Sequence, residues 1–127
     1  MVEDLRFSAV TYAGTWYTDN YSVNSGGSSV LALSAAARAT FEFNGTVAKW
    51  IGYRDAWSGI ANVYEDGVLK GQVDTYSATD QAQAVLYTIT GLTSGAHTLT
   101  IEVTGTRNTS AKSAWVWVDA FEAASTD

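Results

Sequence analysis

The chain of 127 residues contains no cysteine, which excludes disulfide bonds, thiolate metal sites and a cysteine nucleophile. Charged residues are also few, at 16% of the chain, against about 25% in a typical soluble domain. No run of 18 apolar residues occurs, so we expect no membrane-spanning helix. The first ten residues are acidic rather than basic and do not resemble a signal peptide.

Positive charge is scarce as well, because Lys and Arg number 7 against 13 Asp and Glu, for a net charge of −6. A chain of this sign repels a phosphate backbone and an anionic membrane surface, so neither nucleic acid nor membrane is an expected partner. The length suits one domain with one core. With an aromatic share of 13% and abundant Gly, Thr, Ser and Ala, the composition is typical of an all-β secreted module. We expect a single monomeric domain excised from a longer exported protein.

Alternation of apolar and polar residues dominates the chain and is clearest in "ARATFEFN". There Ala37, Ala39, Phe41 and Phe43 are expected to face one way and the polar residues the other, as in a half-buried antiparallel strand. No helical period persists for three turns. The fold class predicted is an all-β, antiparallel two-sheet sandwich, with weaker strands before residue 34 and clear ones at residues 37–44, 46–53, 59–65, 68–74, 84–90, 96–104 and 114–121.

Short turn signals alternate with longer connections. Residues 44–46 ("NGT"), 65–68 ("EDGV") and 91–96 ("GLTSGA") carry the Gly, Asn and Asp that primed hairpin turns require. The longer connections are residues 54–58, 75–83 and 105–113. Because successive connections of antiparallel strands fall at opposite ends, the three long loops are predicted to meet at one edge, where a scaffold usually places its binding site.

Side chains suited to a sugar are concentrated in these loops. A sugar packs its C–H face on an aromatic ring and pairs its hydroxyls with side chains that donate and accept hydrogen bonds. Trp57 is the leading candidate ring, although it could instead anchor the loop. Arg54 could bind hydroxyls or an acidic sugar, or else form a salt bridge with Asp55 or Asp74. The candidate ligand-binding residues are Tyr53, Arg54, Asp55, Trp57, Tyr76, Gln81, Gln83, Asn108 and Trp115.

Other aromatic and titratable residues have structural interpretations. Trp50 lies within a strand and is expected in the core. Trp115 and Trp117 alternate with Asp119 and Phe121 in the last strand, so core packing is favoured for both, with Trp115 nearer the loops. His97 is in phase with the apolar residues of "AHTLTIEV", which predicts a buried, hydrogen-bonded structural histidine.

Several segments resemble the galactose-binding-like jelly rolls, a superfamily that includes carbohydrate-binding modules of bacterial glycan-degrading enzymes. The matching pieces include "YSVNSGGSS", "GLTSGAHTLTIEVTG" and "WVDAFE", and the similarity is greatest to modules of families 6 and 35. The resemblance implies an extracellular, non-catalytic module that targets an attached glycoside hydrolase or polysaccharide lyase to a polysaccharide or oligosaccharide. It also implies a structural calcium ion held by Asp119, with Glu3 or Asp4 as the only early carboxylate partner.

The sequence leaves two further functions open. The same aromatic and arginine side chains could form a protein-binding surface of an adhesion or cell-surface domain. A small glycan-cleaving enzyme would need two carboxylates across a cleft, for which Asp55 with Asp74 or Asp80 are the available residues. No zinc motif or set of Ser, His and Asp supports catalysis.

Overall fold

The computed structural model describes residues 2–4, 10–19 and 29–124. In this part of the chain there is no helix, and therefore none that is long and apolar enough to cross a membrane. The described strands are β1 (Val2–Asp4), β2 (Val10–Ala13), β3 (Tyr17–Asp19), β4 (Ser29–Ala32), β5 (Arg38–Asn44), β6 (Val47–Arg54), β7 (Ile60–Glu65), β8 (Val68–Asp74), β9 (Gln81–Ile89), β10 (Ala96–Val103), β11 (Val116–Val118) and β12 (Ala120–Ala124).

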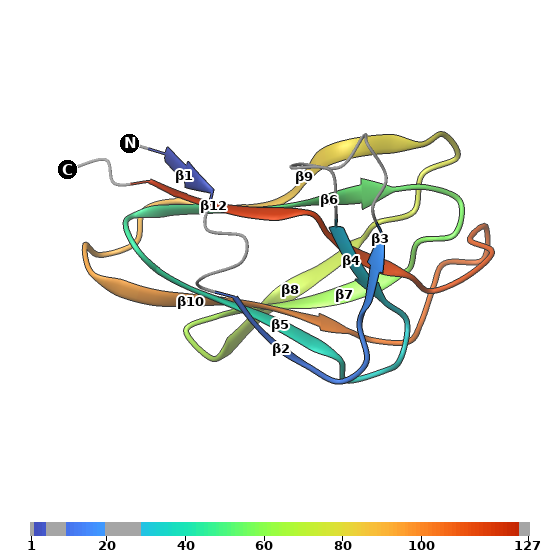
Figure 1. The fold of residues 1–127 in the computed structure, drawn as a ribbon, viewed down its shortest axis with the longest axis horizontal. Helices are drawn as coiled ribbons and strands as arrows, with labels where there is room; N and C mark the ends of the chain where they lie inside the picture. The colour runs from blue at the N-terminus through green and yellow to red at the C-terminus, as the bar shows by residue number, and fades with distance from the viewer. Residues whose placement is uncertain (1, 5–9, 20–28, 125–127) are drawn as a thin grey trace.

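The strands form two large sheets and one small one. The strand orders are β1-β12-β6-β9, β2-β5-β10-β7-β8 and β11-β4-β3, and the paired strands run antiparallel. Figure 1 shows the four-stranded and five-stranded sheets as two facing layers, with β3 and β4 near the end that carries the long loops. The predicted antiparallel β-sandwich is thus confirmed, and the three-stranded sheet is an addition to it.

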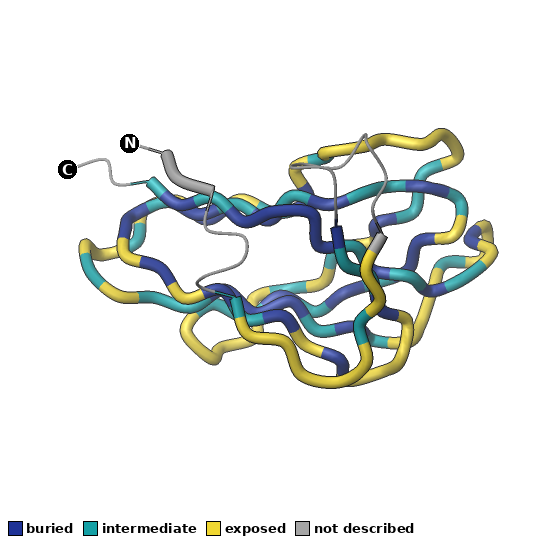
Figure 2. The backbone as a smooth tube through the Cα atoms, viewed as in Figure 1, coloured by how far each residue is buried: buried dark blue, intermediate teal, exposed yellow. Residues whose placement is uncertain are grey.

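The core lies between the two large sheets, and buried residues alternate with less buried ones along strands such as β5 and β6 (Figure 2). The predicted inward face of β5 is confirmed, because Ala39, Phe41 and Phe43 are all buried. The Phe41 ring stacks on Phe121 of the opposite sheet at 4.9 Å between centroids. Trp50 is fully buried, as predicted, and its indole Nε1 donates to the Trp117 carbonyl at 3.0 Å, which satisfies its one polar atom.

Of the three turns predicted as hairpins, only the turn at Asp66 and Gly67 joins strands that pair with each other. These residues have φ values of 51° and 80°, as a primed hairpin turn requires. The connection at residues 44–46 instead leads from β5 to β6, and the one at residues 91–95 from β9 to β10, each crossing between sheets. The hairpin prediction is wrong for these two because turn residues specify a local bend, whereas strand pairing depends on which faces become buried.

The predicted last strand is in fact two strands in different sheets, β11 and β12. The change of sheet occurs at Asp119, whose backbone N–H donates to the Ile51 carbonyl at 2.8 Å. Upstream of this point Val116 and Val118 are buried, whereas Trp115 and Trp117 are only half-buried. The prediction that both tryptophans pack in the core is therefore wrong. The alternation of inward and outward side chains does not continue from β11 into β12, because the two strands belong to different sheets.

Candidate functional site

Three long loops lie together at one end of the sandwich, as the alternation of strand ends predicts. They are residues 55–59 between β6 and β7, residues 75–80 between β8 and β9, and residues 104–115 between β10 and β11. Figure 1 shows them at the end opposite to the turns at residues 44–46, 66–67 and 90–95. We call this group of three loops the rim.

Hydrogen bonds between backbone groups join the three loops to one another. The first loop bonds to both of the others, so it lies between the second and the third. These bonds include Ser77 N to Asp55 O at 3.0 Å, Lys112 N to Ala56 O at 2.7 Å, Trp115 N to Trp57 O at 3.1 Å and Gly59 N to Trp115 O at 2.8 Å. Loops linked in this way present their side chains at fixed relative positions.

Gly59 allows the third loop to approach this closely. A Cβ atom at this position would lie 2.5 Å from the Ala114 Cα and 2.7 Å from the Thr106 carbonyl oxygen. No side chain fits at such distances, so a glycine is needed where β7 leaves the rim.

Trp57 carries the single aromatic ring of the first loop. It is 53% exposed, and the Lys112 ammonium lies 5.3 Å from the ring centroid. Asp55 fixes the loop backbone that carries the exposed Trp57 ring. Its Oδ1 accepts hydrogen bonds from the Trp57 backbone N–H at 2.9 Å and the Ser58 hydroxyl at 2.7 Å. Asp55 is itself buried, so this carboxylate oxygen holds the loop in shape.

Tyr53 and Arg54 at the end of β6 are half-buried. The Tyr53 ring packs against Trp117 at 5.1 Å between centroids. Arg54 donates from Nη1 to the Asp74 carbonyl at 2.9 Å. The guanidinium is therefore tied to the backbone of a neighbouring strand, rather than to the carboxylate of Asp55 or Asp74 that the salt-bridge alternative names.

Tyr76 in the second loop and Gln81 at the start of β9 lie at the rim. The backbone of Tyr76 forms a bridge with Asp55, and the Tyr76 side chain is partly exposed. Gln81 is exposed and donates from its amide to the Ser77 hydroxyl at 3.2 Å. Gln83 is also exposed and has a φ of 52°. This positive φ lies near the start of β9, where the pairing of β9 with β6 shifts its register.

Asn108 connects the third loop to the end of β8, from which the second loop starts. Its Oδ1 accepts hydrogen bonds from the Ser110 and Ala111 N–H groups at 2.8 and 3.1 Å. Its Nδ2 donates to Asp74 Oδ2 at 2.8 Å. Asn108 thus holds the loops together, a role that the sequence did not indicate.

Tyr17, the first residue of β3, lies beside the rim and was not predicted from the sequence. Its ring is 54% exposed and meets the Trp115 ring edge-on at 5.8 Å between centroids. Trp115 in turn forms a bridge with Ser58 of the first loop. The aromatic run "TYAGTWYT" was the available signal, but the short strand β3 has too weak an alternation to locate its partner.

His97 lies at the opposite end from the rim, among the turns. Its Nδ1 pairs with Asp66 Oδ2 at 2.7 Å and its Nε2 with the Thr93 carbonyl, so the predicted hydrogen-bonded histidine is confirmed. Its side chain is 10% exposed. The Thr93 carbonyl and the Asp66 carboxylate both raise the pKa of His97, because two acceptors favour the doubly protonated ring.

Asp119, the predicted calcium ligand, is 2% exposed and lies where β11 gives way to β12. Within residues 2–4, 10–19 and 29–124, no group of three or more His, Asp and Glu side chains gathers as a metal site would require. The backbone of β1 pairs with β12, with Asp4 opposite Glu122, so the N-terminal segment does reach the last strand. The side chains of Glu3 and Asp4 lie outside the described part of the structure.

No protein-family model matches the chain. Two curated proteins of Flavonifractor plautii are similar in sequence, an A type blood alpha-D-galactosamine galactosaminidase at 38% identity and an A type blood N-acetyl-alpha-D-galactosamine deacetylase at 35%. Each match covers 77% of this chain, and the chain spans 9% and 13% of the length of these relatives. The similarity is therefore to one small segment of each enzyme.

Solved structures with a similar fold include whole carbohydrate-binding modules. A CBM36-1 domain of a xylanase from the hindgut metagenome of Trinervitermes trinervoides matches with a TM-score of 0.61, covering 96% of this chain and 95% of that domain, at 16% identity. The chain has the fold of a carbohydrate-binding module. A CBM36 module in complex with calcium and xylotriose matches at 0.55, covering 96% and 97% at 17% identity, so the resemblance seen in the sequence is confirmed at the level of the fold.

Proposed function

We propose that the chain is a non-catalytic carbohydrate-binding module that keeps an attached glycan-degrading enzyme close to its substrate outside the bacterial cell. The observation that carries the proposal is the exposed Trp57 ring, presented on a rim that hydrogen bonds hold in shape. The curated relatives support an enzyme as the partner domain, since both are glycan-acting enzymes that this chain matches over a small share of their length. The complex of a CBM36 module with xylotriose supports an oligosaccharide as the ligand.

The side chains proposed for the site divide into two groups. Trp57 supplies the stacking face, and Tyr76 and Gln81 supply polar groups beside it, because these three are at least partly exposed in or next to adjoining loops. Asp55 and Asn108 shape the loops through hydrogen bonds within the rim. The full set proposed remains Tyr53, Arg54, Asp55, Trp57, Tyr76, Gln81, Gln83, Asn108 and Trp115.

Replacing Trp57 tests this function. We expect Trp57→Ala to weaken binding of an array-selected oligosaccharide at least tenfold, or about 1.4 kcal/mol, because the sugar loses its apolar partner. The melting temperature should stay close to that of the wild type, since the ring is half exposed. The measurements are isothermal titration and a thermal melt of each variant.

Two control variants make the result specific. Leu69→Ala removes a side chain of the same 53% exposure at the start of β8, away from the rim, and should change neither binding nor stability. Trp50→Ala should unfold the domain, because that ring is in the core. Wild-type affinity in Trp57→Ala would place the site elsewhere.

A protein-binding role is the second candidate, because exposed Trp and Tyr rings with a nearby Arg also characterise protein interfaces. A glycan array separates the two: binding to no glycan, together with capture of a defined cell-surface protein that Trp57→Ala abolishes, would favour adhesion. Catalysis has weaker support. A glycosidase needs two carboxylates free to reach the substrate, whereas Asp55 is buried and hydrogen-bonded within its own loop.

A further inference from the structure

The small sheet of β3, β4 and β11 has an aromatic outer face beside the rim. Tyr17 lies opposite Leu31, and Leu31 lies opposite Trp117, so these three side chains share one face of the sheet. The two valines of β11 alternate with Trp117 and are buried on the other face. Trp115 precedes Trp117 by two positions and joins the outer face, where its ring meets Tyr17.

Tyr17 and Trp115 are the part of this face that stays open. Trp117 is covered, because Tyr53 packs on its ring at 5.1 Å between centroids and its indole Nε1 is buried. Tyr17 is 54% exposed, and its ring is inclined at 72° to that of Trp115 at 5.8 Å between centroids. Two rings set at this angle form the walls of a corner, which one sugar ring can enter with its C–H face on an aromatic face.

The polar atoms of this corner have no partner in the protein. Neither the Tyr17 hydroxyl nor the Trp115 indole N–H forms a hydrogen bond with another residue of segments 2–4, 10–19 and 29–124. The Trp115 N–H is also open to solvent, unlike that of Trp117. A hydroxyl that donates and accepts, and an N–H that donates, are therefore both available to the hydroxyls of a sugar.

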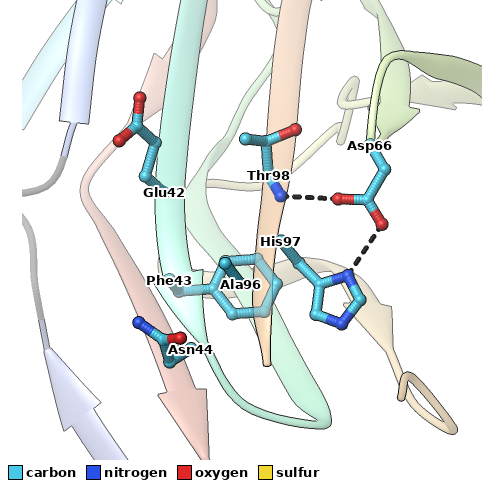
Figure 3. A pocket seen from close by; sticks show the side chains of 7 residues that line it. All are labelled: Glu42, Phe43, Asn44, Asp66, Ala96, His97 and Thr98. Carbon is cyan, nitrogen blue, oxygen red and sulfur yellow. Dashed lines mark hydrogen bonds and ion pairs between the residues drawn. The ribbon is translucent and has the colours of Figure 1, made fainter. Parts of the chain in front are cut away.

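The hollow of about 440 Å³ at the opposite end of the sandwich differs in this respect. Figure 3 shows the Asp66 carboxylate there bonded to His97 and to the Thr98 N–H, at 2.7 and 2.8 Å. These groups satisfy one another, whereas the corner of Tyr17 and Trp115 combines exposed rings with unpaired polar atoms.

The corner does not share a surface with Trp57. Trp115 and Ser58 form a parallel bridge, through the bonds from Trp115 N to Trp57 O and from Gly59 N to Trp115 O. Side chains of bridged residues lie on one side of the paired backbone, and those of the residues next to them lie on the other. The rings of Trp115 and Trp57 thus project to opposite sides, and one sugar ring cannot contact both.

We propose that Tyr17 and Trp115 form a second carbohydrate contact, which holds one neutral sugar ring apart from the contact at Trp57. The ligand is neutral because the open face carries no charged side chain. A protein partner would need about 800 Å² of surface, far more than two side chains offer. The proposal rests on the proposed function in that its ligand is a carbohydrate, but it does not require Trp57 to bind one.

Two contacts on different sides of the loops have a functional consequence. A polysaccharide or branched glycan that reaches both at once is held more tightly than a short ligand that reaches one, because the second contact forms at a high effective concentration.

Two-dimensional NMR of the indole N–H groups tests the proposal, because each of the five tryptophans gives its own signal. The whole chain is titrated with xylotriose, cellotriose and N-acetylgalactosamine in turn. We expect the sugar that binds to shift the signals of Trp57 and Trp115 with different midpoints. The signals of Trp16 and Trp50 should not move, since their N–H groups donate to backbone carbonyls within the protein.

Three variants and a control connect the signals to the two contacts. Tyr17→Ala should weaken the binding reported by Trp115 at least tenfold and leave the midpoint at Trp57 unchanged, whereas Trp57→Ala should leave the midpoint at Trp115. Tyr17→Phe keeps the ring and should bind within about threefold of the wild type. Tyr12→Ala removes another exposed ring, which packs on Trp16 instead, and should change neither midpoint.

The outcomes separate this proposal from that for the rim. A shift at Trp57 with none at Trp115 would overturn the corner alone, and a shift at Trp115 with none at Trp57 would support the corner and refute the role of Trp57. Midpoints that are equal and that Tyr17→Ala changes together would describe one site and overturn the second contact. No indole shift with any of the three sugars, with capture of a protein through Tyr17, would overturn both. The wild-type titration decides among the first of these even if Tyr17→Ala fails to fold.

Discussion

Trp50 and Trp57 illustrate how position within one short segment determines the environment of a side chain. Both belong to "WIGYRDAWSG", yet Trp50 is fully buried and Trp57 is 53% exposed. Trp50 points inward from the middle of β6, whereas Trp57 follows the strand end and is held outward by the turn that Asp55 forms. The sequence indicated both positions, because one tryptophan lies within an alternating run and the other between Asp and Gly.

At the residue scale, Phe41→Ala should lower the free energy of unfolding by about 3 to 5 kcal/mol. The ring is fully buried and stacks between Phe43 and Phe121, so its removal leaves a cavity between the sheets. Urea unfolding measures the change. Val68→Ala, at a residue that is 56% exposed, is the matched control and should cost less than about 0.5 kcal/mol. Equal stability of the two variants would contradict the assignment of the core.

At the scale of the elements, a polar network covers the outer face of β5, β10 and β7. Glu102 is at its centre, since it pairs with Arg38 at 2.7 Å and accepts hydrogen bonds from Asn62 and Tyr64 at 3.0 Å each. The hydrogen bond from Asn62 and those from Arg38 and Tyr64 lower the pKa of Glu102. These contacts cross three strands, so they join side chains that the sequence separates by up to 64 positions.

His97 connects two turns of the sandwich, and its pairing predicts a dependence of stability on pH. The raised pKa means that folding favours the protonated ring, so its contribution is complete below the ordinary value of 6.5 and is lost as the pH rises through the folded pKa. For Asp66, whose pKa is lowered, the contribution is present above 3.8 and is lost as the pH falls through the folded pKa.

We therefore expect the melting temperatures of the wild type and His97→Gln to differ most between about pH 4 and pH 6.5 and to converge as the pH rises through the folded pKa of His97. Thermal melts over this range measure the difference. Thr40→Val, on the same sheet but without a titrating group, serves as the control and should show a constant difference at every pH. A His97→Gln difference that does not change with pH would show that the ring contributes by packing alone.

At the scale of the whole molecule, the two ends of the chain meet in one sheet, because β1 pairs with β12 and β12 with β6. Asp119 lies where the chain enters this sheet and is buried there. Among the described residues no three His, Asp or Glu side chains gather at Asp119, so a calcium ion there would need other oxygen ligands, such as backbone carbonyls or residues of the rest of the chain.

We expect a chelator to lower the melting temperature of the wild type by several degrees, because a bound ion stabilises the folded state by mass action. Asp119→Asn should be insensitive to the chelator, and Asp80→Asn, at an exposed loop position, should respond as the wild type does. Elemental analysis of the purified chain provides a second measurement. No calcium, together with a melting temperature that the chelator leaves unchanged, would exclude the site.

The sequence by itself determined the features that depend on neighbouring residues. Alternation identified the inward face of β5, Asp66 and Gly67 identified the hairpin of β7 and β8, and the order of short and long connections grouped the three loops of the rim. These predictions succeed because the side-chain period of a strand and the φ preferences of Gly and Asp are local properties.

Only the tertiary structure decided which strands pair, and this changed several assignments. The turn at residues 44–46 crosses between sheets, the last strand divides at Asp119, and Tyr17 meets Trp115 across 98 positions of sequence. Asp55 and Asn108 likewise brace their loops with bonds whose partners the folded chain brings close. The physical reason is that pairing of sheets and contact between loops follow from burial of apolar faces against distant segments, and no local pattern specifies the distant partner.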